Sequence, residues 1–180
     1  MARLDPIPVE KLTAEQKPIH DHVLAGRKKL GGPFSVLLYN PPLAKAMSEV
    51  VDVLRRDGKL DKRLYELAVL AVARHWSVQY VWAVHEPLGR AAGLTDATIA
   101  AIQARKKPEF AKQDEALVYG ATMELMGGKV LSAPTYDQLI KQFGLDVTLE
   151  IVATAGLYSM IANVLNGFDV PTPNGERPFA

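Results

Sequence analysis

The sequence contains no cysteine among its 180 residues. This absence excludes thiolate nucleophiles, disulfide exchange and metal sites with cysteine ligands. It also fits a reducing compartment, where disulfides are rare. Any chemistry that the chain performs must therefore come from its other side chains.

The chain also lacks an excess of charge of one sign. Twenty-one Lys and Arg face 20 Asp and Glu, which gives a formal net charge of +1. Such a balance creates no broad positive field, so we expect no nucleic-acid or membrane partner. The N-terminal stretch MARLDPIPVEKLT has no apolar signal core, and no run of about 18 apolar residues follows it. We therefore expect a cytoplasmic protein.

What is present has the composition of a soluble globular protein. Apolar residues make up 48% and charged residues 23% of the chain. At this length one core needs no disulfide or metal to hold it. We expect a single domain over residues 1–180, with an N-terminal arm at 1–12 and an extended, proline-containing tail at 168–180.

The hydrophobic pattern predicts an all-α fold, because no segment alternates with the period of two that strands require. Thr13, Gly93 and Thr95 have the residue types and positions of helix caps. The segment Gly31–Pro42 has proline near both ends and is expected to be a loop with a short apolar insert. Helices are expected at residues 13–30, 43–56, 61–93, 97–105, 109–126, 135–143 and 146–167.

The Ala- and Leu-rich stretch at residues 61–93 is the predicted core. In one straight helix, Glu66 and His85 would lie about 28 Å apart and could not cooperate. A break at His75–Ser77, with Ser77 as the next N-cap, would fold the stretch into a hairpin. The two side chains would then be neighbours.

After such a break, one face of the second helix would carry four residues, by the spacing rule of helices. They are Val78, Val81, Trp82 and His85. An imidazole and a carboxylate that meet in an apolar pocket can share a proton near neutral pH, which makes an acid/base device. The alternative is a buried Glu–His pair with a purely structural role, and Trp82 as core. No metal site is expected, because His20 and His22 face different sides of their helix.

Four sequence blocks resemble the carboxymuconolactone decarboxylase family, which includes the alkylhydroperoxidase D-like proteins. They are GPF at 32–34, LLYNPPLA at 37–44, RLYELAVLAVARHWSVQYVWAVHEPLGRAAGL at 63–94, and MIANVLNGFDVPTP at 160–173. The resemblance implies an alkylhydroperoxidase D-like helical bundle with a central antiparallel helical hairpin. It also implies a homo-oligomer, trimeric or hexameric.

Redox members of this family use a glutamate, a C-x-x-C pair and a histidine as a proton relay that reduces peroxides. Carried onto this chain, the relay positions fall on Glu66, Val78, Val81 and His85. Valine has no redox chemistry and no ionisable group, so the resemblance cannot imply a thiol-dependent peroxidase here.

The decarboxylase branch is the more similar one, since its members lack the cysteine pair and keep a histidine in this region. Its reaction removes CO2 from a carboxylated unsaturated lactone and needs no cofactor. By this resemblance, Arg74 or Arg63 would hold the substrate carboxylate, and His85 with Glu66 would protonate the product carbon. Tyr39 takes the place of a family histidine. The predicted substrate-contacting residues are Tyr39, Arg74, Val78, Val81 and Trp82.

Three functional readings follow. The leading one is a cofactor-free lyase, hydrolase or isomerase that acts on a small lactone or oxo acid through Glu66 and His85. The second is a protein of the same fold that binds a small carboxylate or assembles a complex without turnover. The third is peroxide chemistry by a route without thiols.

Overall fold

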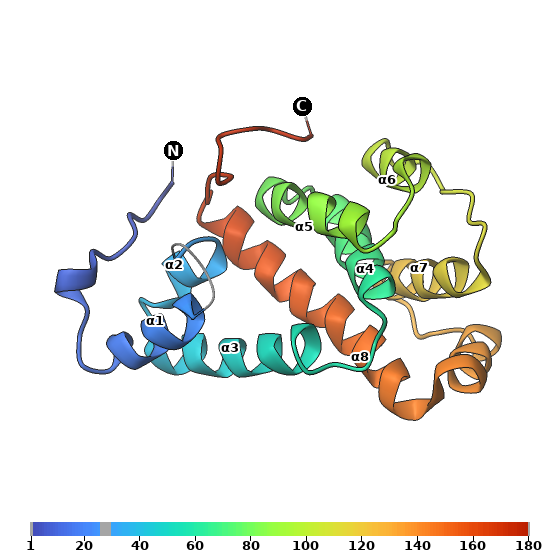
Figure 1. Ribbon diagram of the computed structural model, residues 1–180, viewed down its shortest axis with the longest axis horizontal. Coiled ribbons are helices and arrows are strands. Elements are labelled where there is room, and N and C mark those ends of the chain that lie inside the picture. The colour runs from blue at the N-terminus through green and yellow to red at the C-terminus, as the bar shows by residue number, and fades with distance from the viewer. Residues whose placement is uncertain (1, 26–29, 180) are drawn as a thin grey trace.

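The computed structural model describes residues 2–25 and 30–179 and is drawn in Figure 1. Its described residues form helices and no strand, which confirms the all-α prediction. The elements, in chain order, are the 3-10 helix η1 (Val9–Lys11), α1 (Gln16–Leu24), α2 (Pro33–Leu37), α3 (Pro41–Arg55), α4 (Lys62–His75), α5 (Gln79–Ala91), α6 (Asp96–Gln103), α7 (Gln113–Met126) and α8 (Ala133–Gly167).

Helices α4 and α5 form the central antiparallel hairpin (Figure 1). The chain turns between His75 and Gln79, as expected, but Ser77 is not the N-cap of α5. It has a left-handed backbone with φ of 52°, and the N-cap position belongs to Val78. Ser77 instead makes the turn, and its hydroxyl accepts hydrogen bonds from Arg74 and Arg105.

Close approach of the two hairpin helices depends on Gly89 in α5. A Cβ atom at this position would lie 3.0 Å from Leu94 Cδ1, 3.2 Å from Leu70 Cδ1 and 3.8 Å from Glu66 Cβ. Only hydrogen fits there without displacing neighbours. Gly89 thus lets α5 lie against the part of α4 that carries Glu66.

Helix α4 is the core of the molecule. Ten of its residues, Leu64 to Ala73 in one run, are buried. Asp61 caps its N-terminus by accepting from the backbone N–H groups of Arg63 and Leu64. Helices α5, α7 and α8 pack around it, so a polar side chain on α4 is enclosed unless a cavity reaches it.

Helix α8 runs diagonally across the molecule beside α4 (Figure 1). It combines the two predicted helices at residues 135–143 and 146–167, and Gly144 marks their junction with φ of 74° and ψ of 173°. By length and average hydropathy, α8 is the one helix in the described ranges that could cross a membrane. In the structure it packs against α4 and α7.

The outer segments follow the predictions with adjusted bounds. Thr13 and Gln16 exchange side chain-to-backbone hydrogen bonds of 2.9 and 3.2 Å in the turn before α1, but the N-cap position belongs to Glu15 and not to the predicted Thr13. That helix ends at Leu24, before the predicted end at residue 30, and residues 26–29 lie outside the described residues. The expected loop at 31–42 contains the short helix α2.

Both ends of the chain are anchored to the helices. The N-terminal arm includes η1, a feature that its sequence pattern did not predict. The tail from residue 168 returns over the hairpin, where the side chain of Gln79 bonds both backbone groups of Phe179 at 2.8 and 2.9 Å. Phe179 also packs edge-on against Trp82 at a centroid separation of 5.1 Å.

Candidate active site

The structure brings Glu66 and His85 together in the interior, because the hairpin folds where the sequence predicted a break. Glu66 Oε2 and His85 Nδ1 are 2.7 Å apart, and both residues are buried. A carboxylate beside Nδ1 fixes the proton on that nitrogen and orients the ring. The geometry therefore leaves Nε2 of the neutral ring as an acceptor.

Two tyrosines extend this contact into a chain of four side chains. The Tyr158 hydroxyl in α8 lies 3.2 Å from His85 Nε2, and the Tyr65 hydroxyl in α4 lies 2.8 Å from that of Tyr158. The ring of Tyr158 also makes an edge-on contact with the ring of Tyr65, at a centroid separation of 6.0 Å, and with that of His85, at 5.2 Å. With the proton of His85 on Nδ1, the hydroxyls donate in one direction, from Tyr65 to Tyr158 and on to His85.

Burial sets the protonation of both tyrosines. It raises the pKa of Tyr65 to about 12, an effect that exceeds the lowering by its hydrogen bond to Tyr158. Burial likewise raises the pKa of Tyr158 well above 10, and the neighbouring Tyr65 adds to the rise. Both hydroxyls are therefore protonated at neutral pH and can donate a hydrogen bond or a proton.

A cavity of about 270 Å³ reaches this chain at His85 and Tyr158. Its remaining wall is largely apolar and includes one cationic side chain, Arg55. The lining residues are Gly31, Pro33, Phe34, Val51, Arg55, Tyr80, Val81, Val84, His85, Tyr158 and Ile161. An apolar cavity with few convergent polar groups is the usual form of a small-molecule site.

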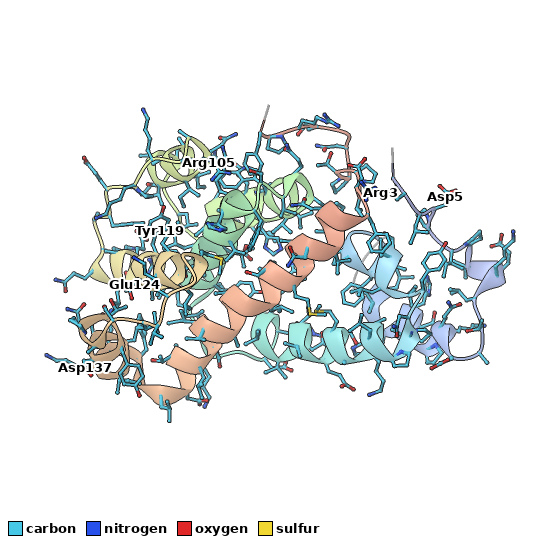
Figure 2. The ribbon with its side chains drawn as sticks, turned by 180° about the vertical axis from the view of Figure 1, so that it is seen from behind. Arg3, Asp5, Arg105, Tyr119, Glu124 and Asp137 are labelled. Carbon is cyan, nitrogen blue, oxygen red and sulfur yellow. The ribbon has the colours of Figure 1, made fainter. Side chains whose placement is uncertain are left out.

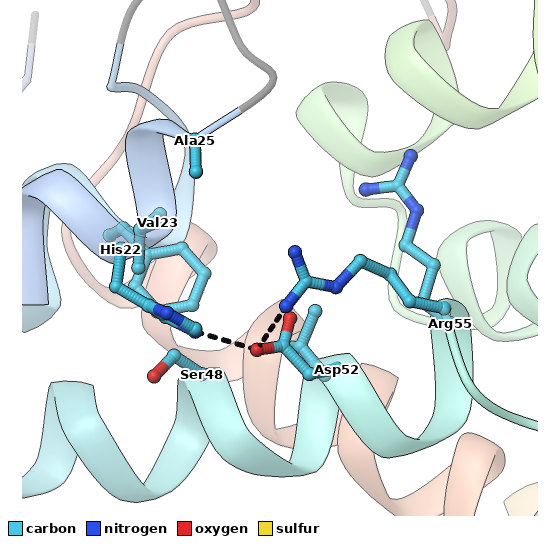
Figure 3. Close-up of a pocket in the computed structure, with 9 residues that line it drawn as sticks. His22, Val23, Ala25, Ser48, Asp52 and Arg55 are labelled. Carbon is cyan, nitrogen blue, oxygen red and sulfur yellow. Dashed lines mark hydrogen bonds and ion pairs between the residues drawn. The ribbon is translucent and has the colours of Figure 1, made fainter.

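Arg55, near the end of α3, is the cation of this cavity. It is half-buried, and within residues 2–25 and 30–179 its guanidinium makes no ion pair with a carboxylate. The adjacent Arg56 pairs with Asp52 at 2.7 Å instead, and Figure 3 shows Arg55 directed away from that ion pair. Arg55 acts electrostatically on both tyrosines, where it opposes the rise in their pKa values.

A second cavity of about 380 Å³ adjoins the first and shares Phe34, Val51 and Arg55 with it. Figure 3 shows this space between α1 and α3, where His22 Nε2 lies 2.6 Å from Asp52 Oδ2. His22 is half-exposed and has no contact with Glu66 or His85. Arg55 thus stands at the boundary of an apolar and a polar cavity.

The apolar residues predicted on the face of His85 separate into two groups. Val81 lines the cavity, together with Val84. Val78 and Trp82 are buried but do not line it, and Trp82 packs on Phe179. These two residues fill the core around the site, because α5 turns only part of its predicted face towards the opening.

The predicted arginines and Tyr39 lie elsewhere, which corrects their expected placement beside His85. The Arg74 guanidinium bonds the Gln103 carbonyl at 2.6 Å and Ser77 at 3.1 Å, and it lies over Phe179. Arg63 is held by Asp114 at 2.7 Å and by Glu115, so it has carboxylate partners already. Tyr39 is half-exposed and donates to the Asp5 carbonyl at 2.9 Å.

The sequence pattern did not predict three residues of this region, namely Arg55, Tyr65 and Tyr158. Arg55 follows the amphipathic stripe of α3 and reads as an ordinary charged helix end. The tyrosines are on α4 and α8, 93 positions apart, and only the packing of these helices brings the hydroxyls together. In the described ranges, no three His, Asp or Glu side chains gather in a way that would hold a metal.

A family comparison agrees with the resemblance found in the sequence. Residues 41–107, which span α3 to the end of α6, match the model of the carboxymuconolactone decarboxylase family. The match covers little more than a third of the chain, which contains no cysteine. No curated protein matches at a significant level.

The fold recurs in solved structures of low sequence identity. An alkylhydroperoxidase AhpD core protein, an uncharacterized peroxidase-related protein from Ralstonia eutropha JMP134, is 15% identical, with a TM-score of 0.78 over 96% of this chain and 93% of that one. The debrominase Bmp8, in a cysteine-to-alanine variant with 2,3,4-tribromopyrrole, is 12% identical, with a TM-score of 0.75 over 95% and 91%. A peroxidase-related protein from Silicibacter sp. TM1040 is 13% identical, with a TM-score of 0.75 over 94% and 90%. These likenesses confirm the alkylhydroperoxidase D-like fold.

Proposed function

We propose that the chain is a cofactor-free acid/base enzyme that acts on a small lactone or oxo acid bearing a carboxylate. The observation that supports the proposal is the chain of buried, hydrogen-bonded side chains from Glu66 through His85 and Tyr158 to Tyr65, together with a cavity, lined by the cation Arg55, that reaches this chain at His85 and Tyr158. Such a chain can deliver one proton to a buried carbon and restore itself from solvent.

In this proposal, Arg55 binds the substrate carboxylate through its planar guanidinium. The apolar wall formed by Phe34, Val81 and Ile161 excludes water, so the charged ground state is poorly solvated and loss of CO2 is favoured. As the C–C bond to the carboxylate breaks, its electron pair moves into the conjugated carbonyl of the substrate. CO2 leaves, and the remaining carbon becomes basic.

Protonation of that carbon completes the reaction. For this step His85 carries a proton on Nε2 as well as on Nδ1. Tyr158 gives its hydroxyl proton to the carbon and takes the Nε2 proton of His85, while Glu66 stabilises the imidazolium at Nδ1. The relay then takes one proton from water, so the sum is one carboxylate and one proton converted into CO2 and the protonated product. An isomerisation would use the same groups without the loss of CO2.

The size of the cavity supports a substrate with a single small ring. A volume of about 270 Å³ lies near the lower end of the range for ligand pockets. The debrominase of the same fold forms a complex with 2,3,4-tribromopyrrole, a compound with a single ring. Because this chain has no thiol, we assign it proton transfer and not thiol chemistry.

Release of CO2 from a panel of muconolactones and β-keto acids tests the proposal. We expect the wild type to be active on at least one of them, and His85→Ala to lose at least about 100-fold in kcat, the range of general acid–base catalysis. His22→Ala is the matched control, since His22 is half-exposed and outside the relay. Its activity should be unchanged.

The two neighbouring arginines give a second matched pair. Arg55→Gln should raise KM for the carboxylate substrate, whereas Arg56→Gln should not, because Arg56 pairs with Asp52. A folded wild type that binds these compounds but neither releases CO2 from any of them nor isomerises any of them would refute the enzyme proposal and favour the non-catalytic binding protein.

A further inference from the structure

A separate cavity of about 490 Å³ lies where the α4–α5 hairpin turns. Its walls come from the end of α4, from Ile102 of α6, from the linker between α6 and α7, and from α7 itself. It shares no lining residue with the cavity beside His85. Figure 2 shows Arg105 and Tyr119 at this end of the molecule.

The lining of this cavity carries a one-sided charge, although the chain as a whole is nearly neutral. Five basic side chains contribute to it and no Asp or Glu does. The basic residues are Arg74, His75, Arg105, Lys106 and Lys107. A concave surface lined by charges of one sign concentrates ions of the opposite sign, so this cavity attracts anions.

Two of these cations converge on one neutral oxygen. Arg74 Nη1 and Arg105 Nη2 both donate to Ser77 Oγ, at 3.1 and 2.8 Å. Within the described ranges neither guanidinium forms an ion pair with a carboxylate. Burial lowers the pKa of Arg74, and the nearby charge of Arg105 lowers it further. A bound anion would relieve this repulsion.

The remaining lining of the cavity is apolar and aromatic. Phe110 and Tyr119 lie with their ring centroids 5.3 Å apart, and Ile102 and Met123 also line the cavity. Helix α6 ends at Gln103, and Arg105, two residues further on, has a left-handed backbone with φ of 57°. The cavity thus combines basic side chains with apolar and aromatic ones.

We propose that this cavity binds a small organic anion with a flat apolar body, whose carboxylate or phosphate group is held by Arg105, Lys106 and Lys107 while its body lies against Phe110 and Tyr119. The site is distinct from the proposed active site and does not depend on its function. A ligand here would join the hairpin turn to the α6–α7 linker.

Calorimetric titration of the full chain at low ionic strength tests this proposal with four probes. Benzoate and phenyl phosphate carry both features and distinguish a carboxylate from a phosphate ligand. Inorganic phosphate lacks the apolar body, and benzyl alcohol lacks the charge. We expect one of the first two to bind at least about tenfold more tightly than either control probe, and its affinity to fall as salt is added.

Variants locate the binding. The double variant Lys106→Gln/Lys107→Gln should weaken binding about tenfold or more, and each single variant should weaken it less. Lys112→Gln is the matched control, since Lys112 is also exposed and precedes α7 but does not line the cavity. Arg55→Gln should leave this binding unchanged, which separates it from the His85 cavity.

Three results would overturn the proposal. One is that neither benzoate nor phenyl phosphate binds at millimolar concentration. Another is an equal loss of affinity in Lys112→Gln and in the double variant, which would mean a general charge effect. The third is binding that Arg55→Gln abolishes and the lysine variants leave intact.

Discussion

Replacing Tyr158 with phenylalanine tests the buried chain of hydrogen bonds at its centre. The substitution removes one oxygen that bonds His85 Nε2 at 3.2 Å and Tyr65 at 2.8 Å. It leaves two buried polar groups without this partner, and each such group costs about 1–2 kcal/mol. Tyr158→Phe should therefore lower the free energy of unfolding by about 2–4 kcal/mol, or the melting temperature by about 4–16 °C.

The double variant with Tyr65→Phe makes the test quantitative. Tyr65→Phe alone leaves Tyr158 bonded to His85, so it should cost about 1 kcal/mol. Once both hydroxyls are gone, only His85 Nε2 lacks a partner. The double variant should then be more stable than the sum of the single changes predicts, with a coupling energy of about 1–2 kcal/mol.

Urea unfolding followed by circular dichroism gives the free energy of unfolding of each variant. The values can be compared when the slope of this free energy against urea concentration is the same in the variants and the wild type. Tyr136→Phe is the control, because Tyr136 is half-exposed on α8, and it should change stability by no more than about 0.5 kcal/mol. Single effects that add within about 0.5 kcal/mol would refute the coupled chain.

Three further predictions concern the framework and its pH dependence. Gly89→Ala should destabilise the protein by about 1–3 kcal/mol in the same urea assay, because the added Cβ would lie 3.0 Å from Leu94 Cδ1. Gly156→Ala in α8 is the control. It should be neutral or stabilising, because a Cβ added there would have no atom within 4 Å. Folding raises the pKa of Tyr65 from 10 to about 12. As the pH rises, Tyr65 therefore loses its proton in the unfolded chain before it does so in the folded protein. The free energy of unfolding, measured with urea, should therefore fall between pH 10 and 12, and it should fall less steeply in Tyr65→Phe than in the wild type. The same dependence on pH in both proteins would contradict this prediction. Arg63→Met should cost about 3 kcal/mol in thermal or urea unfolding, because it leaves the buried Glu115 without its cation, and a neutral result would contradict a structural role for that pair.

The sequence predicted the hairpin because helical spacing and one break sufficed to place Glu66 beside His85. The prediction of Ser77 as an N-cap was wrong in detail. Serine is common both at helix N-caps and in turns, so its residue type alone does not decide between them. Only the packed structure shows that Ser77 lies in the turn with a left-handed backbone. Gly93 and Thr95 were placed correctly, since Gly93 has φ of 98° after α5 and Thr95 accepts from the Thr98 N–H.

The cation that lines the His85 cavity was the part that the sequence could not identify. Arg63 and Arg74 lie on α4, the neighbouring helix of the hairpin, but each has its own partners. Arg55 comes from α3 and lines the cavity. The hydrogen-bonded pair of tyrosines was equally hidden. Local patterns place residues on the faces of one helix, whereas contacts between α4 and α8 depend on how those helices cross.

Incorporation of deuterium from D2O into a reacting carbon, followed by NMR on the same panel of lactones and β-keto acids, tests most directly whether the cavity performs proton transfer. The wild type should form a new C–D bond at the carbon that loses the carboxylate or isomerises. Folded Glu66→Gln and His85→Ala should form it at least about 100-fold more slowly. No incorporation by the wild type, or the same rate in His85→Ala, would contradict an acid/base role for this pair.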